Sequence, residues 1–392
     1  MLASMLSTAR RLNGVHFFLA IAVSSTILDA CHEKSEITPV PQINVEEISH
    51  KEVKMQEITS TFSIIPLETS DKSLIQYLKK VVAYDNKFFV LDDQRPLFGI
   101  FSKTGEFLTT ISNQGKGPGE YYVPTDFIID PKEKQIELLD GFNGQILIYD
   151  LQGNYKSRIR TSVQGSYFVK FRNGDYLIYT NMRNEREMPY KLVRINKDGR
   201  ILSRELNYSV KTTQTTSSPF VKTGDDHYLF SEHRCDTIYQ VTQTEITPLS
   251  YIALGKYEMP FEYRTDIALL NQHAHRYAIK SGSPMYLDGK VVIGYDINSN
   301  RSYLIYNLRN RTAQYYKVLN AFDFVFGTPD YSSDKELIGV IHPLSLSLHK
   351  RKPRYELAYK VGDKIPEIEA LRSNYNELDN PFLVVWDLDF SE

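Results

Sequence analysis

Short apolar runs separated by polar turns follow one another along the chain from about residue 80. The first group of runs occupies residues 81–84, 87–92, 97–101 and 107–111. A turn at Asp85-Asn86 joins its first two runs, and a turn containing Gly105 joins its last two. Short runs bounded by turn residues are typical of β-strands. The group therefore predicts four consecutive strands, A to D.

The same unit returns twice in close register. The second copy occupies residues 127–130, 135–140, 145–150 and 155–159, and the third occupies 168–171, 175–179, 190–195 and 200–206. Gly105, Gly153 and Gly199 stand in the turn before the last strand of each copy, 48 and 46 residues apart. Glycine suits a tight hairpin whose backbone needs positive φ. The constant spacing predicts a repeat architecture.

Three looser copies complete the series. The fourth contains residues 228–231 and 237–241, the fifth contains 290–294 and 302–306, and the sixth contains 322–326, 336–341 and 381–386. The sixth copy lacks a fourth strand, and the apolar segment 62–67 ahead of the first copy is the candidate to supply it. The pattern predicts an all-β fold: a six-bladed β-propeller of four-stranded antiparallel blades, closed by an N-terminal strand. The alternative is a β-sandwich followed by a second domain.

Two segments interrupt the strand pattern. Residues 255–282 separate the fourth and fifth copies, and Leu270, Ala274 and Tyr277 within them have helical spacing. We expect a short helical insertion that packs across the rim of the ring. Residues 343–380 interrupt the sixth copy with a polar stretch that we expect to be partly helical.

The segment 115–121, directly after the first copy, reads Gly-Lys-Gly-Pro-Gly-Glu-Tyr. It resembles a signature of the six-bladed β-propeller lipoproteins of Gram-negative bacteria, NHL-like propellers that are mostly of unknown function. The resemblance covers roughly residues 58–389 and implies the fold rather than an activity. A phosphate-binding loop would need a different glycine spacing followed by a helix. We therefore expect residues 115–119 to form a fixed crossover, with Glu120 bonding its backbone amides.

The N-terminus is typical of an export signal. Arg10 and Arg11 supply positive charge, and residues 17–28 supply an apolar segment too short to span a bilayer comfortably. Residues 28–31, Leu-Asp-Ala-Cys, resemble a bacterial lipobox, which implies lipidation of Cys31; the alternative is a plain cleaved signal peptide. We expect a signal peptide at 1–31, a tether at 32–57 and the propeller at 58–392. The expected location is the cell envelope of a Gram-negative bacterium, in the periplasm or at the outer membrane.

Charge and cysteine content narrow the function classes. The 46 Lys plus Arg residues nearly balance the 48 Asp plus Glu residues, so the basic excess of a nucleic-acid-binding domain is missing. The two cysteines exclude a disulfide scaffold and a cysteine-rich zinc site. If Cys31 carries lipid, Cys235 has no partner in the chain, and we expect it to be a buried, small apolar residue. No nucleic acid is expected among the partners.

A propeller places its B–C loops and its D-to-A crossovers on one face, which we call the mouth face. Loops on a rigid scaffold are the default place for a ligand site. Polar side chains occur in the B–C loops at similar blade positions, and the candidate ligand-binding residues are Asp92, Arg95, Asp140, Asn143, Arg183, Glu232, His233, Arg234 and Asp296.

Three interpretations of this set remain open. In the first, the aspartates cap turns and the arginines pair with them. In the second, the arginines and a tyrosine-rich rim bind a carbohydrate, a peptide or an envelope protein. In the third, Asp92, Asp140, Glu232 and Asp296 hold Ca²⁺ or act as acid and base in a hydrolase or lyase, with His233 as the proton carrier. We expect binding rather than catalysis, and no resident cofactor or metal.

Overall fold

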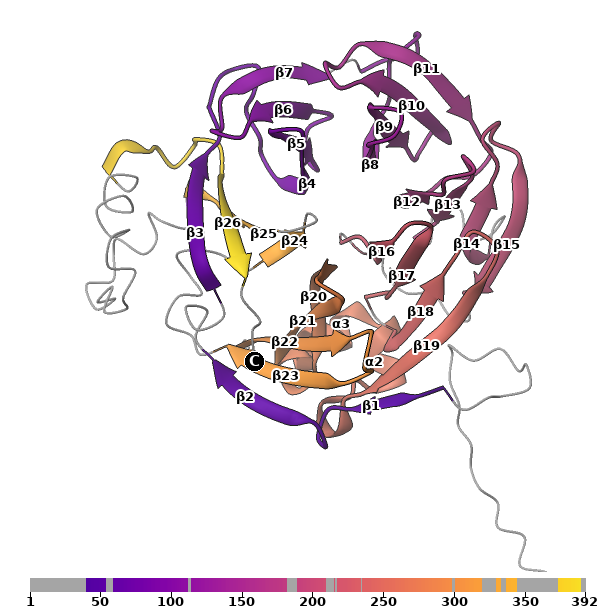
Figure 1. Ribbon diagram of the computed structural model, residues 1–392, viewed down its shortest axis with the longest axis vertical. Coiled ribbons are helices and arrows are strands. Elements are labelled where there is room, and N and C mark those ends of the chain that lie inside the picture. The colour runs from indigo at the N-terminus through magenta and orange to yellow at the C-terminus, as the bar shows by residue number, and fades with distance from the viewer. Residues whose placement is uncertain are drawn as a thin grey trace, which may run out of the picture.

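The computed structural model shows a ring of radially arranged β-sheets (Figure 1). Each sheet runs from an inner strand at the central channel to an outer strand at the rim, and the six-bladed propeller is confirmed. The structure describes residues 40–53, 59–111, 114–181, 189–208, 215, 217–233, 235–297, 300–318, 329–332, 336–343 and 373–388.

Each blade is an antiparallel sheet whose strands follow one another from the channel outwards. Blade 1 consists of β4 (Leu78–Tyr84), β5 (Lys87–Asp92), β6 (Phe98–Ser102) and β7 (Phe107–Ile111). Blade 2 consists of β8 (Pro124–Asp130), β9 (Gln135–Asp140), β10 (Gln145–Asp150) and β11 (Tyr155–Arg160). Blade 3 consists of β12 (Tyr167–Lys170), β13 (Tyr176–Tyr179), β14 (Tyr190–Ile195) and β15 (Ile201–Asn207).

The second half of the ring follows the same order. Blade 4 consists of β16 (Phe220–Gly224), β17 (His227–Phe230), β18 (Thr237–Val241) and β19 (Ile246–Ala253). Blade 5 consists of β20 (Ile279–Leu287), β21 (Lys290–Ile297), β22 (Asn300–Asn307) and β23 (Ala313–Val318). Blade 6 consists of β24 (Pro329–Ser332), β25 (Leu337–Ile341), β26 (Phe382–Leu388) and β3 (Thr59–Pro66).

Blade 6 differs in one respect from the sequence prediction. Its inner strand is β24, which begins at Pro329, whereas the prediction placed this strand at 322–326, outside the described residues. The pattern favoured the more apolar segment, but β24 pairs with β25 through Tyr331 and Ser332 and needs few apolar side chains. Most of the interruption at 343–380 also lies outside the described residues.

The predicted closure of the ring by an N-terminal strand is confirmed. Strand β3 pairs antiparallel with β26, with Ile64 opposite Val384. The buried side chain of Asn380, just before β26, accepts a hydrogen bond from Ile75 N at 2.7 Å and donates to the carbonyls of Glu68 and Ser73. Residues more than 300 positions apart are thereby joined at one seam.

Part of the segment expected to be a tether forms two strands on the outside of the ring. Strand β1 (Gln42–Asn44) runs parallel to β19, and β2 (Ser49–Val53) runs parallel to β23. Both are visible as indigo strands outside blades 4 and 5 in Figure 1. They cover the free edges of these two blades, which would otherwise offer unpaired backbone groups to other chains. Residues 42–53 therefore belong to the propeller.

The repeated turn glycines lie against the blade before their own. Gly105, Gly153 and Gly199 have φ values of 91°, 89° and 83°. A Cβ atom on Gly105 would lie 1.9 Å from the carbonyl oxygen of Pro66 in β3, and one on Gly199 would lie 1.9 Å from that of Arg160 in β11. Glycine is therefore required both for the turn and for the close approach of neighbouring blades.

The core consists of apolar layers between adjacent blades. One layer joins blades 1 and 2 through Phe89, Phe98 and Phe127, whose aromatic rings include an edge-to-face pair 4.7 Å apart. A similar layer joins blades 3 and 4 around Tyr179 and Phe230. Because a blade buries both of its faces, its central strands are apolar along their whole length rather than in alternation. This explains the continuous runs in the sequence.

Buried and half-buried lysines also bridge neighbouring blades. Lys80 of β4 contacts Asp126 of β8 at 2.7 Å, and Lys170 of β12 contacts Asp130 and Glu137 of blade 2 at 2.6 and 2.5 Å. Lys191 of β14 contacts Glu232 of blade 4 at 2.6 Å, and Lys103 of blade 1 contacts Glu336 beside β25 at 2.8 Å. Each of these lysines faces a carboxylate of the adjacent blade. Such pairs link the sheets of neighbouring blades through side chains and fix their relative position.

The insertion between blades 4 and 5 is helical, as expected. It contains η1 (Gly255–Tyr257), α2 (Phe261–Thr265), α3 (Ile267–His273) and η2 (Ala274–Arg276). Asp266 caps α3 by accepting from the amides of Ala268 and Leu269. Arg264 of α2 contacts Asp236 of blade 4 at 2.8 Å, which holds the insertion against that blade. No helix among the described residues is long and apolar enough to cross a membrane.

Because β3 closes the ring, substitutions at two adjacent positions of this strand should differ strongly in their effect on stability. Ile64 is buried and Ser63 is exposed. Ile64→Lys should lower the free energy of unfolding by about 3 kcal/mol, because it buries an unpaired charge at the closing strand. The matched control, Ser63→Lys, should change it by less than about 0.5 kcal/mol. Urea unfolding measures both; equal stability of the two variants would show that β3 does not hold the ring closed.

The junction of blades 2 and 3 predicts a dependence of stability on pH. Burial raises the pKa of the Asp130 carboxyl, but hydrogen bonds from Lys170 and from the amides of Glu133 and Lys132 outweigh it and hold this pKa below its usual value. Between the folded and the unfolded pKa, the unfolded chain binds more protons. The stabilisation is therefore complete above about pH 4 and is lost as pH falls through the folded pKa.

Urea unfolding at pH 5 and pH 3 tests this dependence. Asp130→Asn should remove part of the stability difference between the two pH values, whereas Asp85→Asn, at an exposed carboxylate, should leave it unchanged. An unaltered difference in the Asp130 variant would contradict the assignment.

Candidate functional site

The aspartates that end the second strands of blades 1 and 2 bind backbone amides of the crossovers. The buried Asp92 carboxylate accepts from Gln76 N at 2.6 Å and Gln94 N at 2.7 Å. The buried Asp140 carboxylate accepts from Tyr122 N at 3.0 Å and from the Asn143 side chain at 2.8 Å. Both aspartates thus tie a B–C loop to the crossover that enters the same blade, the arrangement of the capping interpretation.

The other candidate residues are distributed over several blades. The half-buried Arg95 donates to the carbonyl of Leu74 at 3.0 Å. Glu232 is buried and accepts from Lys191 and from the Tyr179 hydroxyl at 2.8 Å; although burial acts to raise the pKa of its carboxyl, these partners hold that pKa below its usual value. Asp296 pairs with Ile279 within blade 5. Arg183 and Arg234 lie outside the described residues.

The capping aspartates hold two exposed tyrosines on the mouth face. Asp92 accepts from the amide of Tyr77 at 3.4 Å, and Asp140 accepts from the amide of Tyr122. Among the described residues these two are the exposed tyrosines, with exposed fractions of 51% and 55%. They lie at the entry to blades 1 and 2, where Tyr77 is one residue before Leu78, the strand partner of Asp92, and Tyr122 is two residues before Pro124, the strand partner of Asp140. The other described tyrosines are buried or half-buried, whereas these two present their side chains to solvent on neighbouring blades.

A second aromatic side chain contacts each of the two tyrosines. Tyr77 stacks on His342 of blade 6, with ring centres 6.1 Å apart, and Tyr122 contacts the exposed Phe142 edge-on at 6.3 Å. Burial lowers the pKa of the His342 imidazole, which favours its neutral form at neutral pH. We call Tyr77, Tyr122, Phe142 and His342 the aromatic rim. It offers ring faces next to polar loops, a surface suited to ligands with both apolar and polar sides.

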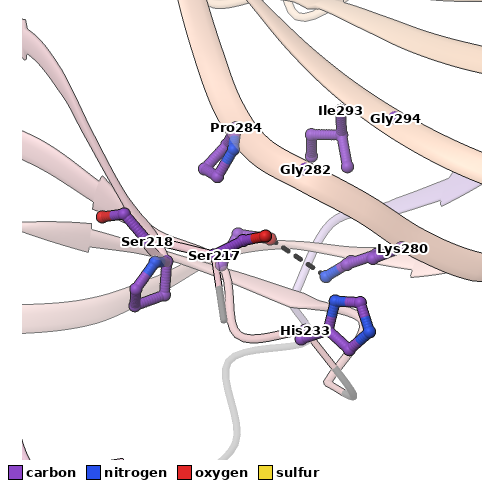
Figure 2. A pocket seen from close by; sticks show the side chains of 10 residues that line it. Ser217, Ser218, His233, Lys280, Gly282, Pro284, Ile293 and Gly294 are labelled. Atoms are coloured by element: carbon purple, nitrogen blue, oxygen red, sulfur yellow. Dashed lines mark hydrogen bonds between the residues drawn. The ribbon is translucent and has the colours of Figure 1, made fainter. Parts of the chain in front are cut away.

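A pocket lies between the inner strands of blades 4 and 5 (Figure 2). It is a small hollow that opens to solvent, and its lining residues are Ser217, Ser218, Pro219, Ser231, His233, Lys280, Gly282, Pro284, Ile293 and Gly294. Of the candidates named from the sequence, His233 is the one that lines it. The sequence pattern did not bring the other members together, because they come from the crossover and the B–C loop of blade 4 and from strands β20 and β21 of blade 5.

A bulge in β20 shapes this pocket. Ser281 pairs with Gly294 and Met285 with Val292, so three residues of β20 lie opposite one of β21. Gly282 adopts a φ of 72° within the bulge, and a Cβ atom on Gly294 would lie 2.6 Å from the Ser281 carbonyl oxygen. Bulges often redirect side chains beside functional sites. Gly282 and Pro284 of this bulge line the pocket at the junction of blades 4 and 5.

Lys280 lies at the base of the pocket, where Figure 2 shows its bond to Ser231 as a dashed line. Its Nζ lies 2.9 Å from Ser231 Oγ and 3.1 Å from the carbonyl oxygen of Glu232, and it also contacts the carbonyl of Cys235. Burial lowers the pKa of the Lys280 ammonium. Among the described residues, no carboxylate lies within ion-pair distance of Lys280, in contrast to the lysines that bridge the other junctions.

The described residues contain no group of three histidine, cysteine or acidic side chains that could hold a metal ion. Asp92, Asp140 and Glu232 bond amides, hydroxyls and ammonium groups instead of facing one another. Cys235 is buried, as expected. Glu120 bonds the amide of Gly117 at 2.7 Å within the crossover segment 115–121, also as expected.

Comparisons with known proteins agree with the architecture. A presumed exported protein of Bacteroides fragilis resembles this chain with a TM-score of 0.68 and 19% identity, over 90% of this chain and 100% of that one. A member of the DUF4221 family from Bacteroides vulgatus resembles it with a TM-score of 0.53 and 9% identity, over 85% of this chain and 97% of that one. Identities this low show a shared fold alone.

The sequence has no significant match among curated proteins. A family model described as "Domain of unknown function (DUF4934)" matches residues 40–387, a range that includes β1, β2 and every blade. The protein therefore belongs to the DUF4934 family, and its fold is the six-bladed ring expected from the sequence.

Proposed function

We propose that the protein is a binding protein of the cell envelope that takes a carbohydrate ligand at the mouth of its central channel. The observation that carries this proposal is the pair of exposed tyrosines, Tyr77 and Tyr122, at the entries to adjacent blades, whose backbone amides are bound by buried aspartates. Exposed aromatic side chains cost solvation free energy, and a regular pair of them beside polar loops marks a binding surface.

Carbohydrate fits the chemistry of this surface. Sugar rings present C–H groups on their faces, which pack on aromatic rings, and hydroxyl groups at their edges, which bond amides and charged groups. The exposed Asn143 and the half-buried Arg95 lie in the B–C loops of the same two blades. A peptide or an envelope protein is the alternative ligand, and titration with both kinds of ligand separates them.

Substitution of the two tyrosines tests the proposal. Each of Tyr77→Ala and Tyr122→Ala should weaken glycan binding by roughly fivefold, because each removes a stacking partner worth about 1 kcal/mol. Titration calorimetry with envelope and host glycans, and in parallel with peptides, measures the affinities. Leu202→Ala, at an exposed side chain of β15, is the matched control and should bind normally. Wild-type affinity in the double tyrosine variant would overturn the site.

Thermal unfolding in the presence of glycans or divalent metals also distinguishes binding from metal-assisted catalysis. If a divalent metal, rather than a glycan, raised the unfolding temperature strongly, the hydrolase or lyase alternative would replace the binding role.

We propose further that the chain is exported and anchored through lipid on Cys31. The export-like pattern of residues 1–31 and the likeness to a presumed exported protein support this. Cys31→Ala should shift the protein from the membrane fraction to the soluble fraction of cells that express the full chain. The same membrane association in the variant and the wild type would rule out the lipid anchor.

A further inference from the structure

The junction of blades 4 and 5 contains a lysine in surroundings unlike those of the other bridging lysines. Lys80, Lys170 and Lys191 each contact a carboxylate of a neighbouring blade. Lys280 is 5% exposed and instead contacts two backbone carbonyls and the hydroxyl of Ser231. A buried ammonium group without a carboxylate partner is costly, so a lysine in this position is often neutral.

A charged Lys280 donates in all three of these contacts, and a neutral Lys280 fits the same geometry if Ser231 becomes the donor. A neutral lysine has two N–H groups and one lone pair, whereas a carbonyl oxygen accepts only. The carbonyls of Glu232 and Cys235 take the two N–H groups, and the lone pair is left toward Ser231 Oγ at 2.9 Å. Ser231 then donates its hydroxyl proton to Lys280. Burial also lowers the pKa of the Lys280 ammonium, in agreement with this geometry.

The same two residues line the pocket, with hydroxyl groups of other residues close by. Ser231 and Lys280 both reach its surface, and Ser217 and Ser218 line it from the crossover that enters blade 4. The amide of Ser218 donates to the side chain of Ser283 in the β20 bulge at 3.0 Å, which fixes the crossover against blade 5. A nucleophile, a base that contacts it and nearby hydroxyl donors are the components of an acyl-transfer site.

We propose that Ser231 and Lys280 form a serine–lysine dyad that cleaves esters of short acyl groups, with Ser231 as nucleophile and Lys280 as general base. The small pocket, narrowed by Pro219, Pro284 and Ile293, suits a short acyl group rather than a long chain. This activity goes beyond the proposed binding role and does not depend on the aromatic rim.

The reaction balances without a cofactor. Ser231 gives its proton to Lys280 as Oγ forms a bond to the carbonyl carbon of the ester, and the carbonyl oxygen becomes negative. Collapse of this adduct breaks the bond to the alcohol, which leaves with the proton from Lys280. Water then attacks the acyl-serine, giving one proton to Lys280, and Ser231 recovers that proton when the acid departs. The products are a carboxylic acid and an alcohol.

Covalent labelling of the full chain with a fluorophosphonate, followed by peptide mass spectrometry, tests the dyad. We expect the label on Ser231, and we expect the same protein to hydrolyse p-nitrophenyl acetate. The labelling rate should rise with pH to a plateau, with a midpoint below the usual lysine value of about 10.4, because the neutral amine is the active form. No label on Ser231 between pH 6 and 10 would overturn the proposal.

Variants separate a catalytic lysine from a structural one. Ser231→Ala should abolish labelling and hydrolysis, and Lys280→Met should slow both at least 100-fold while circular dichroism shows a folded ring. Lys280→Arg retains donors for the two carbonyls but supplies no base, so it should be as slow as Lys280→Met. Ser203→Ala and Lys256→Met, at positions outside the pocket, should match the wild type.

Two outcomes would contradict the role of Lys280. One is a folded Lys280→Met or Lys280→Arg protein that labels at the wild-type rate. If neither variant folds, the pH profile of the wild type decides, because a rate that rises with hydroxide without a plateau also refutes the lysine base. Glycan affinity measured on Ser231→Ala is independent of these results, so failure of the dyad and failure of the rim are distinguishable.

Discussion

The structure depends on the antiparallel pairing of β3 with β26, which joins the two ends of the ring. A ring of sheets is stable only when each blade has a neighbour on both sides, because both faces of every blade are apolar. The pairing of Ile64 with Val384 and the three bonds of the Asn380 side chain form that last contact. Strands β1 and β2 then cover two further edges, so the N-terminal segment touches three blades.

Lysines between the blades have different roles, depending on whether their partner is a carboxylate or a neutral oxygen atom. A lysine with a carboxylate partner, such as Lys170 with Glu137, is charged and fixes the relative position of two sheets. At the junction of blades 4 and 5, Lys280 contacts only neutral oxygen atoms, and there a lysine becomes a candidate base. The difference arises from the partner that the adjacent blade supplies rather than from the lysine itself.

The mouth face shows how a structural motif supports an exposed surface. Asp92 and Asp140 are buried and bond backbone amides, so they contribute rigidity to the loops. The tyrosines whose amides they bind, Tyr77 and Tyr122, remain exposed. The polar residues of a B–C loop can thus support the proposed ligand surface without being part of it. The aromatic rim, rather than the carboxylates, presents side chains to the solvent.

The sequence by itself determined the number of blades, the turn glycines and the closing strand, because strand length, turn chemistry and the regular glycine spacing are local properties. It misplaced the inner strand of blade 6, which is poor in apolar residues. It also indicated that Asp92 and Asp140 are equivalent, since they end equivalent strands. Only the tertiary structure placed β1 and β2 on blades 4 and 5, and only it brought Ser231 within 2.9 Å of Lys280, a residue 49 positions further along the chain. Such contacts depend on how neighbouring sheets pack and on one bulge in β20, which no local pattern encodes.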